Sequence, residues 1–389
     1  MKANRVLNVF FAFVAISPLL YSCSSTESSS DSTAVSVATE ETPSVSLADV
    51  CPNPLVIQTD WYPEADHAGT YQLIGTNGTV DKAKGTYSGP LGETGLTLEI
   101  RGGGPYIDYA SQSQQFYSDK DIFLAYVDTS EAIKVAANTP VVAVMANYEK
   151  GPQILMWDPS IHNFENFADI GKSNAKVLFF DGASYMDYLV GTNLLKKDQI
   201  DGSYDGSPAR FLVEGEKGLV QQGFATAEPY KYENEIEGWK KPVKYLLIHD
   251  SGHAIYQSAL SARKADLEDE KVRSCLAGLV PLMQQSLVDY MTNPEPMNIK
   301  ISEIVKELDT FWTDSPELNA AATKVMKDLG LVSDGSNGYI GDMDEARVQK
   351  LIDELTPTFS AKGVEVVAGL KAADIFTNDF ISTEIGLGS

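Results

Sequence analysis

Basic side chains, cysteines and long apolar runs are all scarce in this chain. Its 389 residues include 30 Lys and Arg against 54 Asp and Glu, which gives a formal charge of −24. Such a surface repels nucleic acid and has no electrostatic attraction to an anionic membrane. We therefore expect no nucleic-acid partner. With 43% hydrophobic and 22% charged residues, the composition otherwise suits a soluble globular protein of one or two domains.

The one long apolar run lies at the N-terminus. Lys2 and Arg5 precede an almost unbroken apolar stretch over residues 6–20, and polar residues follow it. This pattern is typical of a secretory signal, and the run is short for a membrane span, which needs about 20 apolar residues. Cys23, at the expected cleavage point, resembles the lipobox cysteine of bacterial lipoproteins, which is lipidated and becomes the mature N-terminus. We expect residues 1–22 to be a signal peptide and Cys23 to anchor the protein to the outer face of the cell membrane. A plain signal peptide and a single anchor helix are the alternatives.

Two cysteines remain, Cys51 and Cys275. In an oxidising compartment such a pair is more often bridged than free. Cys51 comes just before the first strand-like run, and Cys275 lies in a long helical pattern. We predict a disulfide that ties the start of the ordered chain to a C-terminal helix, with two buried thiols as the alternative.

The chain changes character twice along its length. Residues 23–50 are rich in Ser, Thr, Glu and Val and have almost no large side chains, so we predict a disordered tether. After residue 55, short apolar runs alternate with helical patterns, which is typical of α/β proteins. From Leu267 onward, apolar stripes at helical spacing predict helices alone. The predicted strands cover 55–61, 96–101, 122–127, 141–145, 177–180, 223–225 and 244–248, and the predicted helices cover 67–74, 130–137, 185–195, 208–214 and 227–235.

This order predicts two α/β lobes with a hinge and a helical C-terminal tail. The first lobe would comprise residues 51–147 and the second lobe residues 148–248. Residues 249–389 would return to the first lobe and pack their helical tail on it. The predicted disulfide fits this arrangement because it would join the first strand to the tail within one lobe.

The segment from residue 58 to residue 71 ends a strand and opens a helix. Pro63 stops the strand, and Asp66 is a suitable N-cap. Ligands of open α/β sheets bind at the carboxyl ends of strands, where amide donors are free. The side chains expected around such a ligand are Trp61, Glu64, His67 and Tyr71.

This segment resembles the opening of the thiamine-pyrimidine-precursor-binding family, which also covers nitrate- and sulfonate-binding proteins of ABC importers. Members carry Asp-Trp, a Pro and then His-x-Gly-x-Tyr, and the resemblance continues with lower specificity to about residue 262. It implies a type II periplasmic-binding-protein fold, in which two lobes close on a small ligand. The matching residues of this chain are Asp60, Trp61, Pro63, His67, Gly69 and Tyr71.

Two departures from the family pattern stand out. The usual Gly-Tyr-Phe after the first helix is missing, and a Gly-rich insertion over 76–95 takes its place, which we expect to be a surface excursion. Fungal pyrimidine synthases of this superfamily carry a cysteine cluster near the return crossing. Here residues 248–253 read Ile-His-Asp-Ser-Gly-His, so a synthase that consumes its own histidine is disfavoured.

The first strand end could hold a planar ligand. Trp61 and Tyr71 could stack on it, because aromatic faces give contact area at low entropic cost, although Trp61 could equally end a buried strand. Glu64 and His67 could hydrogen-bond ring nitrogens or an amine. We expect His67 to bind rather than to catalyse, because no partner lies at a useful spacing.

Other strand ends offer further ligand positions. The glycines of 101–106 would let a ligand approach the backbone, although this is no dinucleotide fingerprint and could be a plain loop. Segments 128–131 and 181–185 each end a strand and begin a helix, and Ser184 lacks the flanking glycine of a nucleophile elbow. A carboxylate after the strand at 223–225 would suit an amino-bearing ring or a cation. The ligand-binding residues expected here are Gly103, Tyr106, Glu131, Tyr185, Asp205 and Glu228.

Two segments look superficially like metal sites. Residues 201–206 start like a calcium loop, but Leu212 occupies the position of the bidentate Glu, so two tight turns are expected. His249 and His253 are four residues apart, a spacing that serves zinc only on a helix, and Gly252 argues against one. We predict no metal, no cofactor and no catalytic residue.

These observations favour a solute-binding lipoprotein of an ABC importer, and the resemblance implies a small aromatic heterocycle as its ligand. A thiamine pyrimidine precursor is the single best hypothesis, with nitrate, sulfonate and flavin-type ligands as alternatives. A secreted pyrimidine-forming enzyme that uses His67 with Glu64 or Glu228 is a rival, and a surface adhesion or scaffold lipoprotein is a third reading. The expected partners are permease and ATPase subunits, and we expect a monomer.

Overall fold

The structure is a computed structural model and describes residues 46–388. The predicted signal peptide, Cys23 and most of the tether lie outside these residues. The last part of the predicted tether does not fit the expectation, because Leu47–Val50 forms a short helix, α1, that packs on the long tail helix α9 (Glu270–Thr292). Among residues 46–388, none of the helices has the length and apolar character needed to cross a bilayer.

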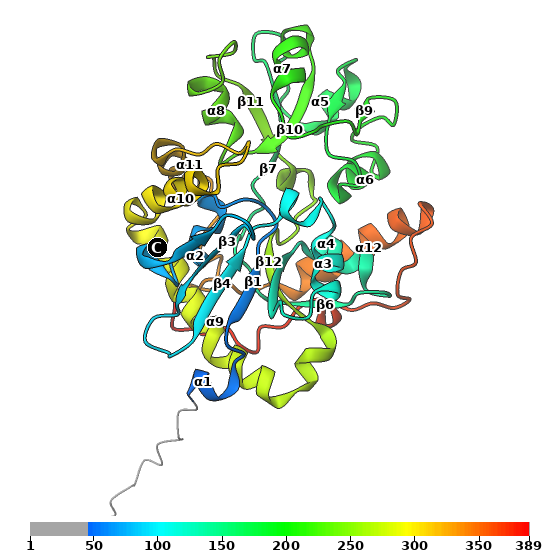
Figure 1. Cartoon of the computed structure of the whole chain (residues 1–389). Helices are drawn as coiled ribbons and strands as arrows, with labels where there is room; N and C mark the ends of the chain where they lie inside the picture. Colours follow the sequence, from blue (N-terminus) through cyan, green and yellow to red (C-terminus); the bar gives the residue numbers. More distant parts are fainter. Residues whose placement is uncertain (1–45, 389) are drawn as a thin grey trace, which may run out of the picture. The chain divides into compact units, whose positions relative to one another are not determined.

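The first lobe is built on a seven-stranded mixed sheet (Figure 1). Its central strand β1 runs parallel to β4 and β5, and β12 runs antiparallel to β5 and β6. All residues of β1 and β5 are buried, as expected for strands covered on both faces. In spatial order the strands are β2 (Thr79–Asp81), β3 (Thr86–Pro90), β4 (Thr97–Arg101), β1 (Leu55–Gln58), β5 (Leu124–Val127), β12 (Ala259–Arg263) and β6 (Val141–Met145).

The Gly-rich insertion is not a surface excursion, and that expectation was wrong. Its residues form the antiparallel pair β2 and β3, which extends the sheet beyond β4. Tyr87 on β3 is buried and stacks on Tyr71, with ring centroids 5.8 Å apart. The Tyr87 hydroxyl also donates to the carbonyl of Gly75 at 2.7 Å. The insertion is therefore held by the core of the first lobe.

The second lobe is built on a five-stranded sheet. Strand β10 is central, antiparallel to β7 and parallel to β8. Neither β7 nor β12 was among the predicted strands; the Gln-Ile-Leu-Met-Trp run of β7 suits a helix equally well, and β12 has small and polar residues. In spatial order the strands are β11 (Lys244–Leu247), β7 (Gln153–Trp157), β10 (Val220–Phe224), β8 (Val177–Leu178) and β9 (Ile200–Asp201).

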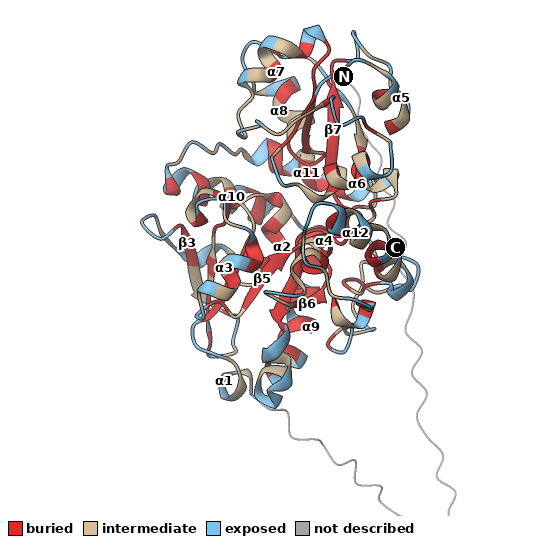
Figure 2. Ribbon diagram, turned by 90° about the vertical axis from the view of Figure 1, so that its right-hand side faces the viewer, coloured by how far each residue is buried: buried red, intermediate tan, exposed pale blue. Residues whose placement is uncertain are grey.

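The chain passes from the first sheet to the second over residues 146–152 and returns over 248–258. Helices accompany both sheets, and the predicted α/β class with two lobes is confirmed. Figure 2 shows that the buried residues gather on the strands of both lobes. The shorter helices are η1 (Ala65–His67), α2 (Ala68–Tyr71), α3 (Gln112–Ser118), α4 (Thr129–Val135), α5 (Phe167–Lys172), α6 (Ser184–Gly191), α7 (Ala209–Glu214) and α8 (Glu228–Asn234).

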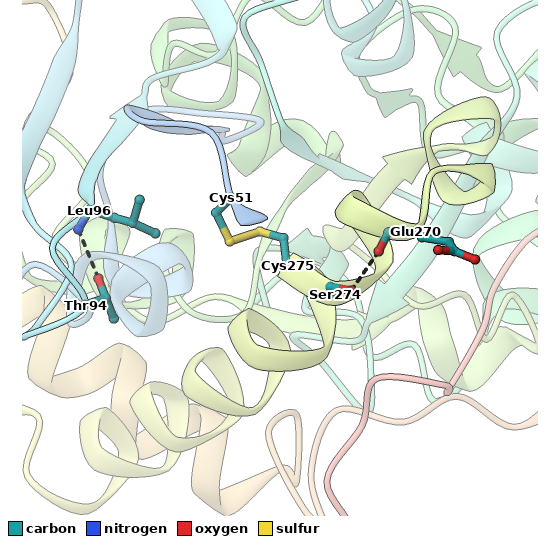
Figure 3. Close-up of a disulfide and its surroundings, with 6 residues drawn as sticks. All are labelled: Cys51, Thr94, Leu96, Glu270, Ser274 and Cys275. Carbon is teal, nitrogen blue, oxygen red and sulfur yellow. Dashed lines mark hydrogen bonds between the residues drawn. A yellow bond between two sulfur atoms is a disulfide. The ribbon is translucent and has the colours of Figure 1, made fainter. Parts of the chain in front are cut away.

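The helical tail starts at the base of the first lobe. Its longest helix, α9, packs on α1 and α2. The Sγ atoms of Cys51 and Cys275 are 2.01 Å apart and form a disulfide (Figure 3). This bond joins the segment before β1 to α9 within the first lobe. The other tail helices are α10 (Glu295–Leu308), α11 (Pro316–Asp328) and α12 (Glu345–Ala361).

The tail also reaches the second lobe, which the sequence did not predict. Helix α12 packs on α4 of the first lobe and on α6 of the second lobe. Helix α11 approaches α8, and the Ser315 hydroxyl donates to Oε1 of Glu235 at 2.6 Å. The tail therefore bridges the two lobes on either side of the crossings.

Candidate functional site

A cavity of about 260 Å³ lies between the two lobes. The first lobe contributes the loop after β1 and helix η1, and the second lobe contributes β7, β10 and the start of α8. The return crossing adds Ser258, and the loop between α10 and α11 adds Trp312. The side chains that line the cavity are those of Asp60, Trp61, Glu64, Asp66, His67, Gln153, Phe180, Ala183, Tyr204, Gln222, Phe224, Ala227, Glu228, Ser258 and Trp312.

Asp60 and His67 form a pair in the lining of this cavity, with His67 buried and Asp60 partly exposed. The Nε2 atom of His67 is 2.7 Å from Oδ1 of Asp60, and its Nδ1 is 3.0 Å from the carbonyl oxygen of Tyr62. The two ring nitrogens therefore each lie within hydrogen-bonding distance of an oxygen atom, which fixes the orientation of the ring. Burial alone would raise the pKa of Asp60, but the charge of His67 and hydrogen bonds from His67 and Ser258 outweigh burial and lower that pKa. The pair therefore fixes the loop after β1.

Aromatic rings from both lobes and from the tail form the walls. The rings of Trp61 and Phe180 face each other across the lobes with centroids 6.3 Å apart. Trp312 meets Trp61 edge to face at 5.8 Å, and Tyr204 packs on Phe180 at 4.8 Å. Such walls suit the faces of a small planar ligand.

Three further carboxylates surround the cavity. Oδ1 of Asp66 accepts hydrogen bonds from the Tyr148 hydroxyl at 2.5 Å and from the Thr226 hydroxyl at 2.9 Å. Oε2 of Glu228 accepts from the backbone N–H of Phe224 at 2.6 Å. Burial raises the pKa of Asp66 and of Glu228 against the effect of these hydrogen bonds.

Glu64 differs from the other carboxylates because none of the described residues donates a hydrogen bond to it. Its nearest cationic atom is Nε2 of His67, 3.9 Å from Oε1. Burial raises the pKa of Glu64 well above its usual value, and the negative charges of Asp66, Asp60 and Glu228 add to this effect. Apart from this contact with His67, the Glu64 carboxyl group has no polar partner among residues 46–388.

Two buried amides complete the polar lining. Oε1 of Gln222 accepts from the backbone N–H of Phe180 at 2.8 Å and from the Tyr185 hydroxyl at 2.6 Å. These contacts fix the orientation of the Gln222 amide, because only its oxygen can accept from the N–H of Phe180. The Nε2 atom of Gln222 remains available as a donor. The Nε2 atom of Gln153 donates to the carbonyl of Gly223 at 2.9 Å, which leaves its Oε1 as an acceptor. Neither remaining atom has a partner within residues 46–388.

Comparison with known proteins identifies the architecture. No known family profile matches the chain, and no curated protein sequence matches it. Solved structures do match. The chain shares its fold with the ligand-binding component of an ABC-type import system from Staphylococcus aureus, solved with zinc bound (TM-score 0.51, 12% identity, covering 85% of this chain and 99% of that one).

Two sulfonate-binding proteins have the same fold. They are the periplasmic aliphatic sulphonate binding protein SsuA of Escherichia coli (TM-score 0.50, 14% identity, covering 80% and 89%) and the alkanesulfonate-binding protein SsuA of Xanthomonas axonopodis pv. citri bound to MOPS (TM-score 0.51, 11% identity, covering 84% and 99%). This chain has the periplasmic-binding-protein fold. The similarity agrees with the fold that the segment after β1 implied, and at these identities it says nothing of the ligand.

Four of the expected site residues line the cavity of this periplasmic-binding-protein fold, namely Trp61, Glu64, His67 and Glu228. Tyr71 does not, because it is buried in the core of the first lobe against Tyr87. Asp66 is not an N-cap. It lies inside η1, and its carboxylate points to Tyr148 and Thr226 instead.

Gly103 and Tyr106 lie behind the cavity wall rather than in it. A Cβ on Gly103 would come within 2.4 Å of the carbonyl oxygen of Thr59, so only glycine lets this loop pack against the loop that carries Asp60. Tyr106 meets Tyr62 edge to face with centroids 5.5 Å apart and faces a separate surface pocket. Both residues support the site and do not reach the cavity.

Glu131 is also outside the cavity. Its Oε1 accepts from the backbone N–H and the hydroxyl of Ser113, which ties α4 to α3. Tyr185 acts on the cavity through Gln222, whose amide it orients. Asp205 caps an exposed turn by accepting from the N–H of Ser207 at 2.9 Å, and it lies in an adjoining outer pocket.

The segments that looked like metal sites behave as connections. Residues Ile248–Ser251 form a short 3₁₀ helix, so His249 and His253 do not share the face of an α-helix. Burial lowers the pKa of His253 to about 3, which keeps its ring neutral. Within residues 46–388, no three His, Cys, Asp or Glu side chains are arranged to hold a metal ion.

Several residues that line the cavity were not predicted from the sequence. Trp312 lies in the helical tail, about 250 positions from the first strand end, and no local signal links the two. Gln153 and Gln222 lie on strands, where polar side chains normally face solvent. Here both are buried, and that burial is a property of the assembled fold.

Proposed function

We propose that this protein is the solute-binding component of an ABC importer, acting outside the cytoplasm and anchored through a lipid on Cys23. It captures a small solute between its lobes, delivers it to a permease and leaves it chemically unchanged. The observation that carries the proposal is the cavity lined by aromatic rings from both lobes, with Trp61 on one side and Phe180 on the other.

Solved structures with the same fold support a solute-binding function. Those named above are a ligand-binding component of an ABC import system and sulfonate-binding proteins. In this chain both nitrogens of His67 are engaged by Asp60 and Tyr62. With both nitrogens occupied, the ring is held in place by the protein and neither nitrogen is free for the catalytic role that a pyrimidine-forming enzyme would require.

The size of the cavity and the residues that line it restrict the kinds of ligand it can hold. A cavity of about 260 Å³ is slightly smaller than the usual range for ligand sites, about 300–1,000 Å³, and favours a single ring over a flavin. Carboxylates line it, and among its described lining residues there is no Lys or Arg to receive a sulfonate or nitrate. A small amino-bearing heterocycle, such as a thiamine pyrimidine precursor, fits this lining best.

Ligand capture would act through the two crossings. A ligand that contacts Trp61 of the first lobe and Gln222 of the second stabilises the conformation in which the lobes meet. Trp312 of the tail closes on the same cavity, so the tail takes part in enclosing the ligand. The closed face that results is the surface a permease would recognise.

A thermal-shift screen tests the proposal, because a ligand that binds only the folded state raises its apparent stability. The panel is pyrimidines, thiamine, flavins, sulfonates and nitrate. We expect pyrimidines to raise the melting temperature of the wild type and of Ile161→Ala, which alters an exposed side chain of the second lobe. Trp61→Ala should lose the shift. A protein that none of these compounds stabilises would not be a solute-binding protein of this kind.

A further inference from the structure

We infer that the ligand is a small planar organic cation and that the carboxylate of Glu64 receives its positive charge. The inference rests on the proposed function and deepens it by naming the chemical class of the solute. Neither the sulfonates nor the zinc bound by proteins of the same fold belong to this class.

The carboxylates of the cavity are not equivalent, and their partners single out Glu64. Asp60 is paired with the ring of His67, whose Nε2 lies 2.7 Å from its Oδ1. Asp66 is met by two hydroxyls and Glu228 by a backbone N–H. Glu64 alone among these lining carboxylates has no hydrogen-bond donor within residues 46–388. Its side chain is 16% exposed, which keeps it accessible from the cavity.

A second observation points independently to a ligand at the same place. Gln222 is only 5% exposed and is held by Phe180 and Tyr185, yet its Nε2 donor has no partner within the described chain. Gln153, 8% exposed, likewise leaves its Oε1 acceptor unmatched. Buried polar groups are normally hydrogen-bonded. A ligand with one acceptor and one donor besides its charge would satisfy both amides.

The aromatic walls favour the same class of ligand. Trp61, Phe180 and Trp312 surround the cavity, and the face of an aromatic ring attracts a cation more strongly when water is excluded. A planar cation can stack on one ring and present its charged N–H edge to Glu64. A neutral ring of the same shape would gain the stacking alone.

Binding of a cation at Glu64 exchanges it for a proton. The titratable groups near Glu64 come from three parts of the chain. They are Asp60, Asp66, His67 and Tyr71 of the first lobe, Tyr148 of the outward crossing, and Glu228 and Lys231 of α8. Burial and the neighbouring acids raise the pKa of Glu64, so without a cation its carboxyl group keeps a proton to higher pH than an exposed glutamate does. The cation then binds the carboxylate, and the proton leaves to solvent. Affinity for the cation should therefore rise with pH.

The experiment compares probes of one shape and three charges. Isothermal titration of the wild type uses benzamidinium, benzamide and benzoate, together with 5-(aminomethyl)pyrimidine, charged as its ammonium form, and its neutral hydroxymethyl counterpart. We expect the cations to bind at least about tenfold more tightly than the neutral probes. Binding of the cation should release protons, measured in two buffers of different ionisation enthalpy, and neutral probes should release none.

Substitution at Glu64 gives the matched control. Glu64→Gln should lower the affinity for cations at least about tenfold and leave the neutral probes unchanged. Glu317→Gln, at an exposed position of α11, removes one negative charge elsewhere and should change neither. If neutral or anionic probes bind as tightly as cations, or if Glu64→Gln keeps its cation affinity, the inference is wrong while the proposed function stands. If no probe of any charge binds, both fail.

Discussion

The hydroxyl of Thr226 donates a hydrogen bond of 2.9 Å to Oδ1 of Asp66 across the cleft between the lobes. Thr226 follows β10 of the second lobe, and Asp66 lies in η1 of the first. The same carboxylate oxygen accepts from Tyr148, which lies on the outward crossing. Asp66 thus joins the first lobe, the second lobe and one of the two connections between them.

Loss of this hydrogen bond should weaken ligand capture with little effect on folding. Thr226→Val keeps the shape of the side chain and removes the donor. A hydrogen bond to a charged group contributes about 1.5 kcal/mol or more, so the closed state should lose stability and the ligand affinity should fall about tenfold. The measurement is isothermal titration together with the melting temperature of the ligand-free protein.

Thr192→Val is the matched control for this prediction. Thr192 donates to the carbonyl of Tyr188 within one turn of α6, so its hydrogen bond does not cross between the lobes. We expect this variant to keep its ligand affinity. Equal losses of affinity in the two variants would show that the contact between Thr226 and Asp66 has no special role in closure.

Stability should depend on pH through Glu64. Burial and nearby acids raise the pKa of its carboxyl group above the usual 4.5, so the folded state holds this proton more tightly than the unfolded state does. The resulting stability is fully present below pH 4.5 and is lost as the pH rises through the folded-state pKa. Glu64→Gln removes this loss and should raise the melting temperature of the ligand-free protein, on the order of 2 °C at pH 8, with no gain at pH 4.

The exposed carboxyl group of Glu317 provides the comparison. Glu317→Gln should give the same melting temperature as the wild type at both pH values. A gain for Glu64→Gln that is equally large at pH 4 would mean that packing, and not the charge, limits stability at this position. Stabilisation coupled to loss of cation binding would show a functional site held at the expense of folding.

The disulfide should stabilise the fold without affecting the ligand. Cys51 and Cys275 are 224 positions apart in the sequence, so the bond closes a long loop in the unfolded chain. Removal of such a bond lowers the free energy of unfolding by about 2–5 kcal/mol. The double variant Cys51→Ser and Cys275→Ser should therefore unfold at lower urea concentration and keep its affinity for ligand. In a Cys23→Ser background, two reactive thiols in denatured, non-reduced protein would contradict the bond.

The sequence predicted the part of the site whose residues lie close together along the chain. Residues 58–71 form one continuous connection from the end of β1 into η1 and α2. The motif therefore placed Trp61, Glu64 and His67 together correctly. The same reasoning failed for Tyr71, which is on the next helical turn and faces the core. Helix orientation relative to the sheet decides this, and it is fixed by packing against β3 and α9 that no local pattern encodes.

The other half of the cavity depends on contacts between distant segments. Gln222 looks like an ordinary polar strand residue until the hydroxyl of Tyr185 is placed against it. The strands β2 and β3 were hidden by glycines, which favour turns, while backbone pairing and the buried side chains of Thr86, Tyr87 and Leu91 hold them. The lobes themselves followed from the alternation of strands and helices, which is a global pattern. That pattern does not show which single side chains from distant segments line the cavity.

Trp312 should contribute strongly to ligand affinity although it lies in the tail. Its ring lies nearly parallel to that of Tyr62, with centroids 5.9 Å apart, and the Nζ atom of Lys231 sits 4.1 Å from the ring centroid. The ring is therefore held between the two lobes at the cavity edge. Trp312→Ala should reduce ligand affinity about tenfold or more, because it removes one aromatic wall of the site.

Phe311→Ala is the matched control. It alters the neighbouring ring, which is 61% exposed and does not line the cavity, and it should change affinity by less than about threefold. Titration of both variants with the same ligand decides the matter. If the two substitutions weaken binding equally, the loop acts only by covering the entrance, and Trp312 is not part of the ligand site.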